Sequence, residues 1–150
     1  VNHPKDPGGE TNLGVTKRVY EEWGGTKDMK DLLVEDVAPI YKKNYWDKVK
    51  GDDLPGGLDL CVFDFGVNAG PGRSAKYLQR MIGTVVDGGI GPNTLKKVAE
   101  YVEANGIEQS IENFQQARQS YYEQLSTFAT FGKGWTRRVN ETTELAKTMV

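Results

Sequence analysis

The chain has 150 residues, of which 27% are charged and 37% hydrophobic, and it carries a net charge of −2 with an isoelectric point near 5.5. Such values are typical of one soluble globular domain, and they exclude the basic excess of a nucleic-acid-binding protein. No apolar run approaches the roughly 18 residues that span a bilayer, and no signal peptide is visible.

Residues 1–16 are rich in turn-forming residues and in polar side chains. Asp6 is followed by Pro-Gly-Gly, which favours a tight turn, so Asp6 and Glu10 are expected on a bent loop. Thr11 and Asn12 come directly after them. Two interpretations are open: the loop is only a turn in which Glu10 serves the start of the following helix, or Asp6 and Glu10 form a general acid/base pair.

The run HPKDPGGETNLGVT, residues 3–16, resembles the motif Asp-x-Gly-Gly-x-Thr-x-x-Gly-Ile-Thr of the phage endolysin N-acetylmuramidases, glycoside hydrolase family 108. The matching residues are Asp6, Gly8, Gly9, Thr11, Gly14, Val15 and Thr16. In the family, a Glu-Gly-Gly-Tyr block with the catalytic acid precedes this motif. We therefore expect the catalytic Glu a few residues upstream of Val1, outside the chain as given.

This resemblance implies a glycosidase that acts through two carboxyl groups and an oxocarbenium-like transition state. The upstream Glu would donate a proton to the leaving oxygen. Asp6 would stabilise positive charge on the sugar or hold the water, and Thr11 would orient that water. Glu10 is a second candidate for the acid, and Asn12 is expected to bind substrate.

Two helical segments are predicted before residue 51. Thr16 is expected to cap a short helix over residues 17–23, which ends at a Gly-Gly pair. The second segment covers residues 34–51, with Pro39 early in it, where a first helical turn tolerates proline. Its apolar face is formed by Val37, Ile40, Tyr41, Tyr45 and Trp46. This stripe is either core or, at Tyr45 and Trp46, also the wall of a sugar-binding cleft, since flat aromatic faces suit pyranose rings.

A loop over residues 51–57 leads into LDLCVFDFGVNA, residues 58–69, which is apolar on most sides. Periodicity does not separate a buried strand from a buried helix here, and we predict a helix because the family has one. Asp64 lies within the apolar run, so it either supports the structure through a bonded partner or approaches the site. Asn68 either forms a turn or presents its amide to a ligand.

The single cysteine and the single histidine point to no special chemistry. Cys61 excludes a disulfide within the chain, and its apolar neighbours predict a buried structural thiol. His3 and Cys61 match no known spacing of metal ligands, so we expect no metal and no cofactor.

Residues 72–100 resemble the predicted peptidoglycan-binding segment that accompanies this lysozyme family. The matching residues are Ala75, Leu78, Gln79, Asp87, Gly88, Ile90, Gly91, Pro92, Thr94 and Leu95. The pattern predicts a helix over residues 73–82, a turn at residues 87–89, and a helix that starts at Gly91-Pro92. The segment either binds peptidoglycan or serves mostly as scaffold.

From Ile107 the apolar spacing predicts a long helix that ends at Gly132 and Gly134, followed by a final amphipathic helix. Arg118 lies on the apolar face of the long helix, where a guanidinium needs an acid or a carbonyl partner. The run Gly-Trp-x-x-Arg-Val-Asn, residues 134–140, also resembles the family.

Together these features predict a mainly α, lysozyme-like helical domain with an N-terminal active-site loop and little or no sheet. We expect a single domain over residues 1–150, in which residues 1–70 form a catalytic-type part. Residues 71–150 would form a peptidoglycan-binding-like helical part packed on it. Asp6, Thr11 and Glu10 are the expected catalytic residues. The expected substrate-binding residues are Asn12, Tyr45 and Asn68.

The resemblance implies an N-acetylmuramidase that cleaves the MurNAc-GlcNAc β-1,4 bond of peptidoglycan as a phage endolysin. The alternative is a non-catalytic peptidoglycan-binding or virion-associated wall module, which the missing Glu favours. We expect glycan strands of peptidoglycan as the partner, with no nucleic acid, no membrane span and a monomeric chain. The expected location is the host cytoplasm and then the periplasm or wall during lysis, or the virion.

Overall fold

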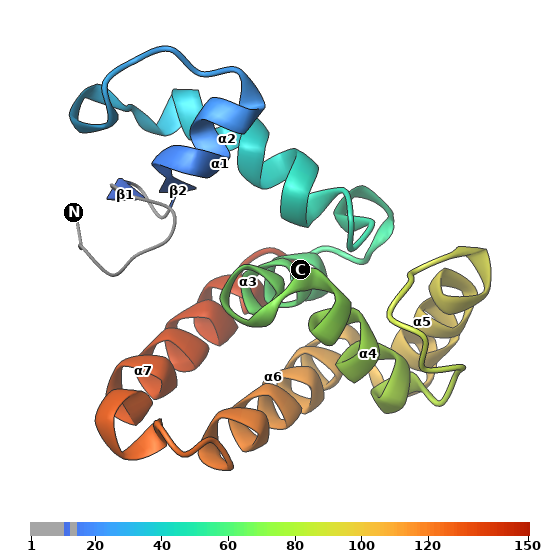
Figure 1. Ribbon diagram of the computed structural model, residues 1–150. Helices are drawn as coiled ribbons and strands as arrows, with labels where there is room; N and C mark the ends of the chain where they lie inside the picture. The colour runs from blue at the N-terminus through green and yellow to red at the C-terminus, as the bar shows by residue number, and fades with distance from the viewer. Residues whose placement is uncertain (1–10, 13–14) are drawn as a thin grey trace. The chain divides into compact units, whose positions relative to one another are not determined.

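Helices make up most of the computed structural model, which describes residues 11–12 and 15–150 (Figure 1). The regular strands in these ranges are only two residues long each. The mainly α prediction is therefore confirmed. The chain forms two compact units, Val1–Asn44 and Tyr45–Val150, which are described separately below.

The first unit begins with a two-stranded hairpin. Strands β1 (Thr11–Asn12) and β2 (Val15–Thr16) are antiparallel, with Thr11 opposite Thr16 and Asn12 opposite Val15. Helix α1 (Lys17–Trp23) follows at once, and the Thr16 hydroxyl accepts a hydrogen bond from the Val19 N–H at 3.3 Å. Gly24, at φ 105°, ends the helix in the left-handed conformation. The predicted cap and the predicted end of this helix are both confirmed.

The rest of the first unit closes a small core. A 3-10 turn (η1, Met29–Asp31) leads to α2 (Val34–Tyr41), which continues as a π-helical turn (η2, Lys42–Trp46) whose last two residues belong to the second unit. The buried residues of this core are Val15, Tyr20, Met29, Leu32, Val37 and Ile40. Pro39 is the sixth residue of α2, so the prediction that it lies in the first turn is wrong.

The second unit is a bundle of helices. Its elements are a 3-10 turn η3 (Gly51–Asp53) and the helices α3 (Leu58–Ala69), α4 (Pro71–Ile82), α5 (Pro92–Asn105), α6 (Ile107–Glu123) and α7 (Phe128–Lys147). Helix α3 packs against α4, α6 and α7, and α6 and α7 lie side by side (Figure 1). This central position explains why the sequence of α3 is apolar on most sides.

Close backbone approach explains the start of α3. Gly57 precedes this helix with φ at 93°. A Cβ atom there would lie 2.7 Å from the Ala146 carbonyl oxygen on α7 and 2.9 Å from the Ile111 Cδ1 on α6. Only glycine combines this backbone conformation with the available space.

The boundary between the last two helices differs from the prediction. Helix α6 ends at Glu123, and α7 begins at Phe128, so Gly132 and Gly134 lie inside α7. Gly132 is buried, and a Cβ atom on it would come within 2.8 Å of the Phe128 ring. The glycine therefore makes room for an aromatic ring one turn earlier. The actual turn, residues 124–127, contains neither Gly nor Pro, which is why the sequence pattern did not reveal it.

Candidate functional site

The predicted catalytic loop lies mostly outside the described residues. Asp6 and Glu10 are not among them. Thr11 and Asn12 form β1, whose backbone pairs with β2 directly before α1, and their side chains are not described. The catalytic roles of Asp6, Thr11 and Glu10, and substrate binding by Asn12, therefore stay predictions.

The aromatic stripe of residues 37–46 is shared between two environments. Val37 and Ile40 are buried in the core of the first unit. Trp46 belongs to the second unit, where its indole N–H donates to the Asp52 carboxylate at 2.8 Å and its ring meets Phe63 edge-on at 5.5 Å. The Trp46 ring also covers Gly51, where a Cβ atom would overlap it. Trp46 thus anchors the η3 turn. Tyr45, next to it, is half-buried, and its role toward substrate stays a prediction.

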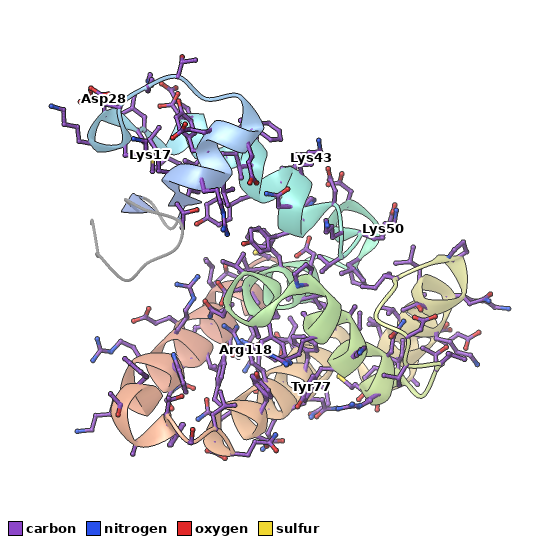
Figure 2. All side chains as sticks on the ribbon, viewed as in Figure 1. Lys17, Asp28, Lys43, Lys50, Tyr77 and Arg118 are labelled. Atoms are coloured by element: carbon purple, nitrogen blue, oxygen red, sulfur yellow. The ribbon has the colours of Figure 1, made fainter. Side chains whose placement is uncertain are left out.

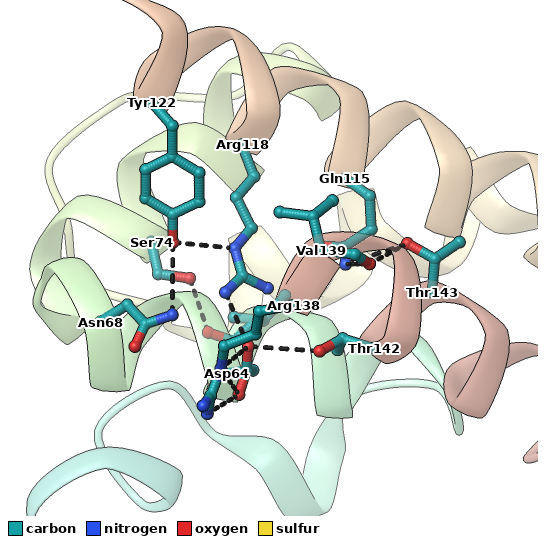
Figure 3. Close-up of polar contacts among 11 residues, drawn as sticks. Asp64, Asn68, Ser74, Gln115, Arg118, Tyr122, Arg138, Val139, Thr142 and Thr143 are labelled. Atoms are coloured by element: carbon teal, nitrogen blue, oxygen red, sulfur yellow. Dashed lines mark hydrogen bonds and ion pairs between the residues drawn. The ribbon is translucent and has the colours of Figure 1, made fainter. Parts of the chain in front are cut away.

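Asp64 is the centre of a buried ionic network (Figure 3). Its carboxylate accepts a hydrogen bond from Arg118 Nη2 at 2.6 Å and from Arg138 Nη2 at 2.5 Å. Arg138 Nε lies 3.1 Å from both carboxylate oxygens, and the Thr142 hydroxyl lies 3.4 Å from one of them. The Arg118 side chain has 0% exposure, whereas that of Arg138 has 51%. The partner that Arg118 was predicted to need is therefore Asp64.

The same network reaches Asn68. The Arg118 Nε atom donates to the Tyr122 hydroxyl at 3.1 Å, and Asn68 Nδ2 approaches that hydroxyl at 3.4 Å (Figure 3). The Arg118 guanidinium also lies 5.5 Å from the ring centres of Phe65 and Tyr122. Asn68 itself is exposed on the last turn of α3, so its side chain is accessible from solvent, and its binding to substrate stays a prediction.

Electrostatics assign Asp64 a supporting role in the bundle. Burial by itself would raise the pKa of Asp64, but the hydrogen bonds and charges of Arg138 and Arg118 outweigh it and hold the pKa below its ordinary value. The carboxylate is thus ionised and both its oxygens accept hydrogen bonds. Such a group is a poor proton donor, and it links α3 to α6 and α7.

Two further kinds of chemistry have no support in the described part of the chain. Cys61 is fully buried, and this burial raises the pKa of its thiol to about 12, so it is a poor nucleophile. Among the described residues no group of three His, Cys, Asp or Glu side chains could hold a metal ion.

None of the described helices is both long and apolar enough to cross a membrane.

A basic groove along α4 was not singled out from the sequence. It is lined by Arg73, Lys76, Tyr77 and Arg80, which follow each other at helical spacing. That spacing of three cations around one tyrosine is visible in the sequence, and it is the signal by which the groove could have been found.

Comparison with known proteins agrees with this arrangement. The family model described as Glycosyl hydrolase 108 matches residues 1–70, and the model described as Predicted Peptidoglycan domain matches residues 73–140. The solved structure of SagA from Brucella abortus is similar over 99% of this chain and 86% of that chain, with 40% sequence identity and a TM-score of 0.82. No protein with a curated description matches the sequence. The matches confirm the resemblance noted in the sequence, and the chain belongs to glycosyl hydrolase family 108, with a peptidoglycan domain following the hydrolase part.

Proposed function

We propose that this protein is a lysozyme that hydrolyses the β-1,4 bond between N-acetylmuramic acid and N-acetylglucosamine in peptidoglycan. The observation that carries the proposal is the family match over residues 1–70, the part that contains the Asp6 and Thr11 motif. Family membership supports a glycoside hydrolase of the lysozyme-like kind, and the second match supports peptidoglycan as the partner. The identity of the bond is the finer part of the proposal.

The proposed chemistry uses two carboxyl groups. The glutamate of the family's Glu-Gly-Gly-Tyr block, which is not present in the 150 residues, protonates the leaving oxygen. The Asp6 carboxylate stabilises the positive charge that develops on the sugar ring or holds the attacking water, and Thr11 orients that water. An oriented carboxylate is effective here because it interacts more strongly with the charged transition state than with the neutral substrate.

The first experiment tests the source of the acid and the bond. The chain is produced with and without a Glu-Gly-Gly-Tyr block ahead of Val1, and both forms are incubated with purified peptidoglycan. We expect only the extended form to release fragments, with reducing N-acetylmuramic acid ends by mass spectrometry. Reducing glucosamine ends or cut peptides would identify a glucosaminidase, an amidase or a peptidase instead. Binding without any release would favour the alternative, a non-catalytic wall module.

The second experiment compares two neighbouring acids in the extended form. Asp6→Asn should lower turnover about 100-fold or more, because loss of one electrostatic stabiliser of the transition state has about this effect. Glu10→Gln is the matched control, since it removes one carboxylate from the same loop, and it should lose far less. Both variants should keep their stability within roughly 1 kcal/mol, as expected for substitutions on the turn that the sequence predicts there. If Glu10→Gln is inactive and Asp6→Asn is nearly normal, Glu10 is the acid.

The biological setting also remains part of the proposal. We propose that a monomeric chain acts on the wall during phage-mediated lysis, either as a free endolysin or on the virion. Genes for phage structural or lysis proteins next to this gene would support that role, and size-exclusion chromatography would measure the oligomeric state.

A further inference from the structure

The groove along α4 has the shape and charge of a binding site. It has a volume of about 660 Å³, and its polar walls are formed by Arg73, Lys76 and Arg80 on the helix and by Asp87 on the loop that follows it. Tyr77, labelled in Figure 2, lies between the cations on the same helix. Three cations and one carboxylate thus line a groove in a chain whose net charge is −2.

Within the described part of the chain, the three cations of the groove have no acidic partner. Among the residues that the structure describes, no carboxylate forms an ion pair within 4.0 Å with Arg73, Lys76 or Arg80. Other cations of the described chain do form ion pairs: Lys27 with Asp36, Lys97 with Glu100, Arg118 and Arg138 with Asp64, and Lys147 with Glu112. The charge of the groove is therefore available to a ligand.

Two of the cations are held in place by aromatic rings. The Arg73 guanidinium lies 4.9 Å from the centre of the Tyr121 ring and donates to the Tyr121 hydroxyl at 2.7 Å. The Arg80 guanidinium lies 5.2 Å from the centre of the Tyr77 ring. Stacking of this kind fixes the orientation of a guanidinium, so less freedom is lost when an anion binds.

The opposite wall is fixed by one buried side chain, Gln79. Its Oε1 atom accepts the N–H groups of Asp87 and Gly88 at 3.0 and 2.9 Å. Its Nε2 atom donates to the Asp87 carboxylate and the Gly89 carbonyl, each at 3.0 Å, and lies 3.2 Å from the Thr94 hydroxyl. The amide of Gln79 thus holds the loop against α4 and sets the width of the groove.

The carboxylate of Asp87 places one negative charge in the groove. Hydrogen bonds from the Gly89 N–H and from Gln79 hold the pKa of the Asp87 carboxyl below its ordinary value, so it is ionised. The groove therefore matches a ligand with several carboxylates and one amino group. A phosphate-only ligand would be attracted by the cations but would gain nothing from Asp87.

We propose that the α4 groove binds the stem peptides of peptidoglycan, with Lys76 and Arg80 on their carboxylates and Asp87 facing the amino group of their diamino acid. This inference rests on the proposed function, because it takes peptidoglycan as the partner. The glycan itself is neutral along most of its length, so a basic groove recognises the peptide and leaves the sugar to the hydrolase part.

The test measures binding of the full chain to a disaccharide-tripeptide by calorimetry. The peptide carboxylates of this ligand are either free or amidated. We expect the free acid to bind about 10-fold or more tightly than the amidated form, since charge-assisted hydrogen bonds are the strong ones. The double variant Lys76→Gln with Arg80→Gln should lose about 10-fold or more for the free acid. Lys96→Gln with Lys97→Gln is the matched control, because it removes two exposed cations of α5 outside the groove, and it should bind as the unchanged chain does.

Three results would overturn the inference: equal binding of the free and amidated peptides, unchanged binding by the Lys76 and Arg80 double variant, or an equal loss in the control.

Inorganic phosphate serves as a second probe, and tight phosphate binding at Lys76 and Arg80 without peptide binding would identify a phosphate site instead. Hydrolysis is scored separately on peptide-free glycan in the extended form. Peptide binding without hydrolysis would contradict the proposed function and leave this inference standing. Hydrolysis without peptide binding would contradict this inference and leave the proposed function standing.

Discussion

The two units of the chain differ in where their ion pairs lie, because the second unit has a buried pair in addition to surface pairs. In the first unit the Lys27–Asp36 pair lies at the surface beside a small core. In the second unit Asp64 and Arg118 are buried inside a much larger core that α3 shares with α4, α6 and α7. A surface pair contributes little because water screens it, whereas a buried pair becomes costly when either partner is lost. Loss of one partner of an ion pair should therefore cost more stability at the buried pair of the second unit than at the surface pair of the first.

The strongest test of this contrast is Asp64→Ala. The substitution leaves Arg118 as an unpaired buried charge, so the free energy of unfolding should fall by about 3–5 kcal/mol. Urea unfolding followed by circular dichroism measures it. Asp36→Ala, which removes the acid of the surface pair, is the matched control and should cost far less. Equal losses at Asp64 and Asp36 would mean that burial does not distinguish the two units.

A second test probes the close packing of the larger core. Gly57→Ala places a methyl group against the Ala146 carbonyl and Ile111, at a backbone φ of 93° that disfavours any side chain. Strain and overpacking together should lower the free energy of unfolding by about 2 kcal/mol or more. The change in urea midpoint checks this. An unchanged midpoint would show that α3 can move away from α7 without loss.

The pH dependence of stability gives a third test. Because the pKa of Asp64 is depressed in the folded chain, its contribution is fully present above the ordinary Asp pKa of about 3.9. That contribution is lost as the pH falls through the lower, folded value. Urea unfolding between neutral and acidic pH should therefore show a loss of stability in acid that is smaller in Asp64→Ala. Parallel pH profiles would exclude Asp64 as a source of acid sensitivity.

The smallest expected effect has the opposite sign. Gly134 lies inside α7, where a Cβ atom would meet nothing within 4 Å. Gly134→Ala should therefore raise the free energy of unfolding by about 0.5–1 kcal/mol through higher helix propensity. A thermal melt measures the gain. Destabilisation would instead support the sequence-based prediction that a helix ends at this glycine.

Local signals explain what could be predicted from the sequence. The short helix of residues 17–23 has a threonine cap and a glycine end, and both signals depend only on neighbouring residues. Pro92 at the start of α5 is the same kind of signal. Arg118 on an apolar face correctly indicated a buried partner, although the sequence could not name Asp64, which lies 54 residues away.

Long-range packing explains what could not be predicted. Gly132 was predicted to end a helix, but in the structure it makes room for the Phe128 ring. The sequence alone does not distinguish these two roles of a glycine. The aromatic stripe of residues 37–46 looked like one face, yet the chain divides into its two units between Asn44 and Tyr45. The predicted division at residue 70 stays a prediction, and α3, which precedes it, packs with the helices that follow. For the N-terminal site, the residues alone left open a simple turn or an acid/base pair of Asp6 and Glu10, and only family resemblance gave Thr11 a role and separated Asp6 from Glu10.

The buried thiol of Cys61 has a practical consequence for measuring motion. A thiol reagent attacks the thiolate, and Cys61 has 0% exposure and a pKa raised to about 12, so the closed bundle is protected from labelling. Modification requires α3 to separate from its neighbours first. At high reagent concentration the labelling rate then equals the rate at which the bundle opens, and at low concentration it reports the fraction of molecules that are open. Labelling of Cys61 therefore measures how fast and how often the helical bundle opens, with no engineered probe.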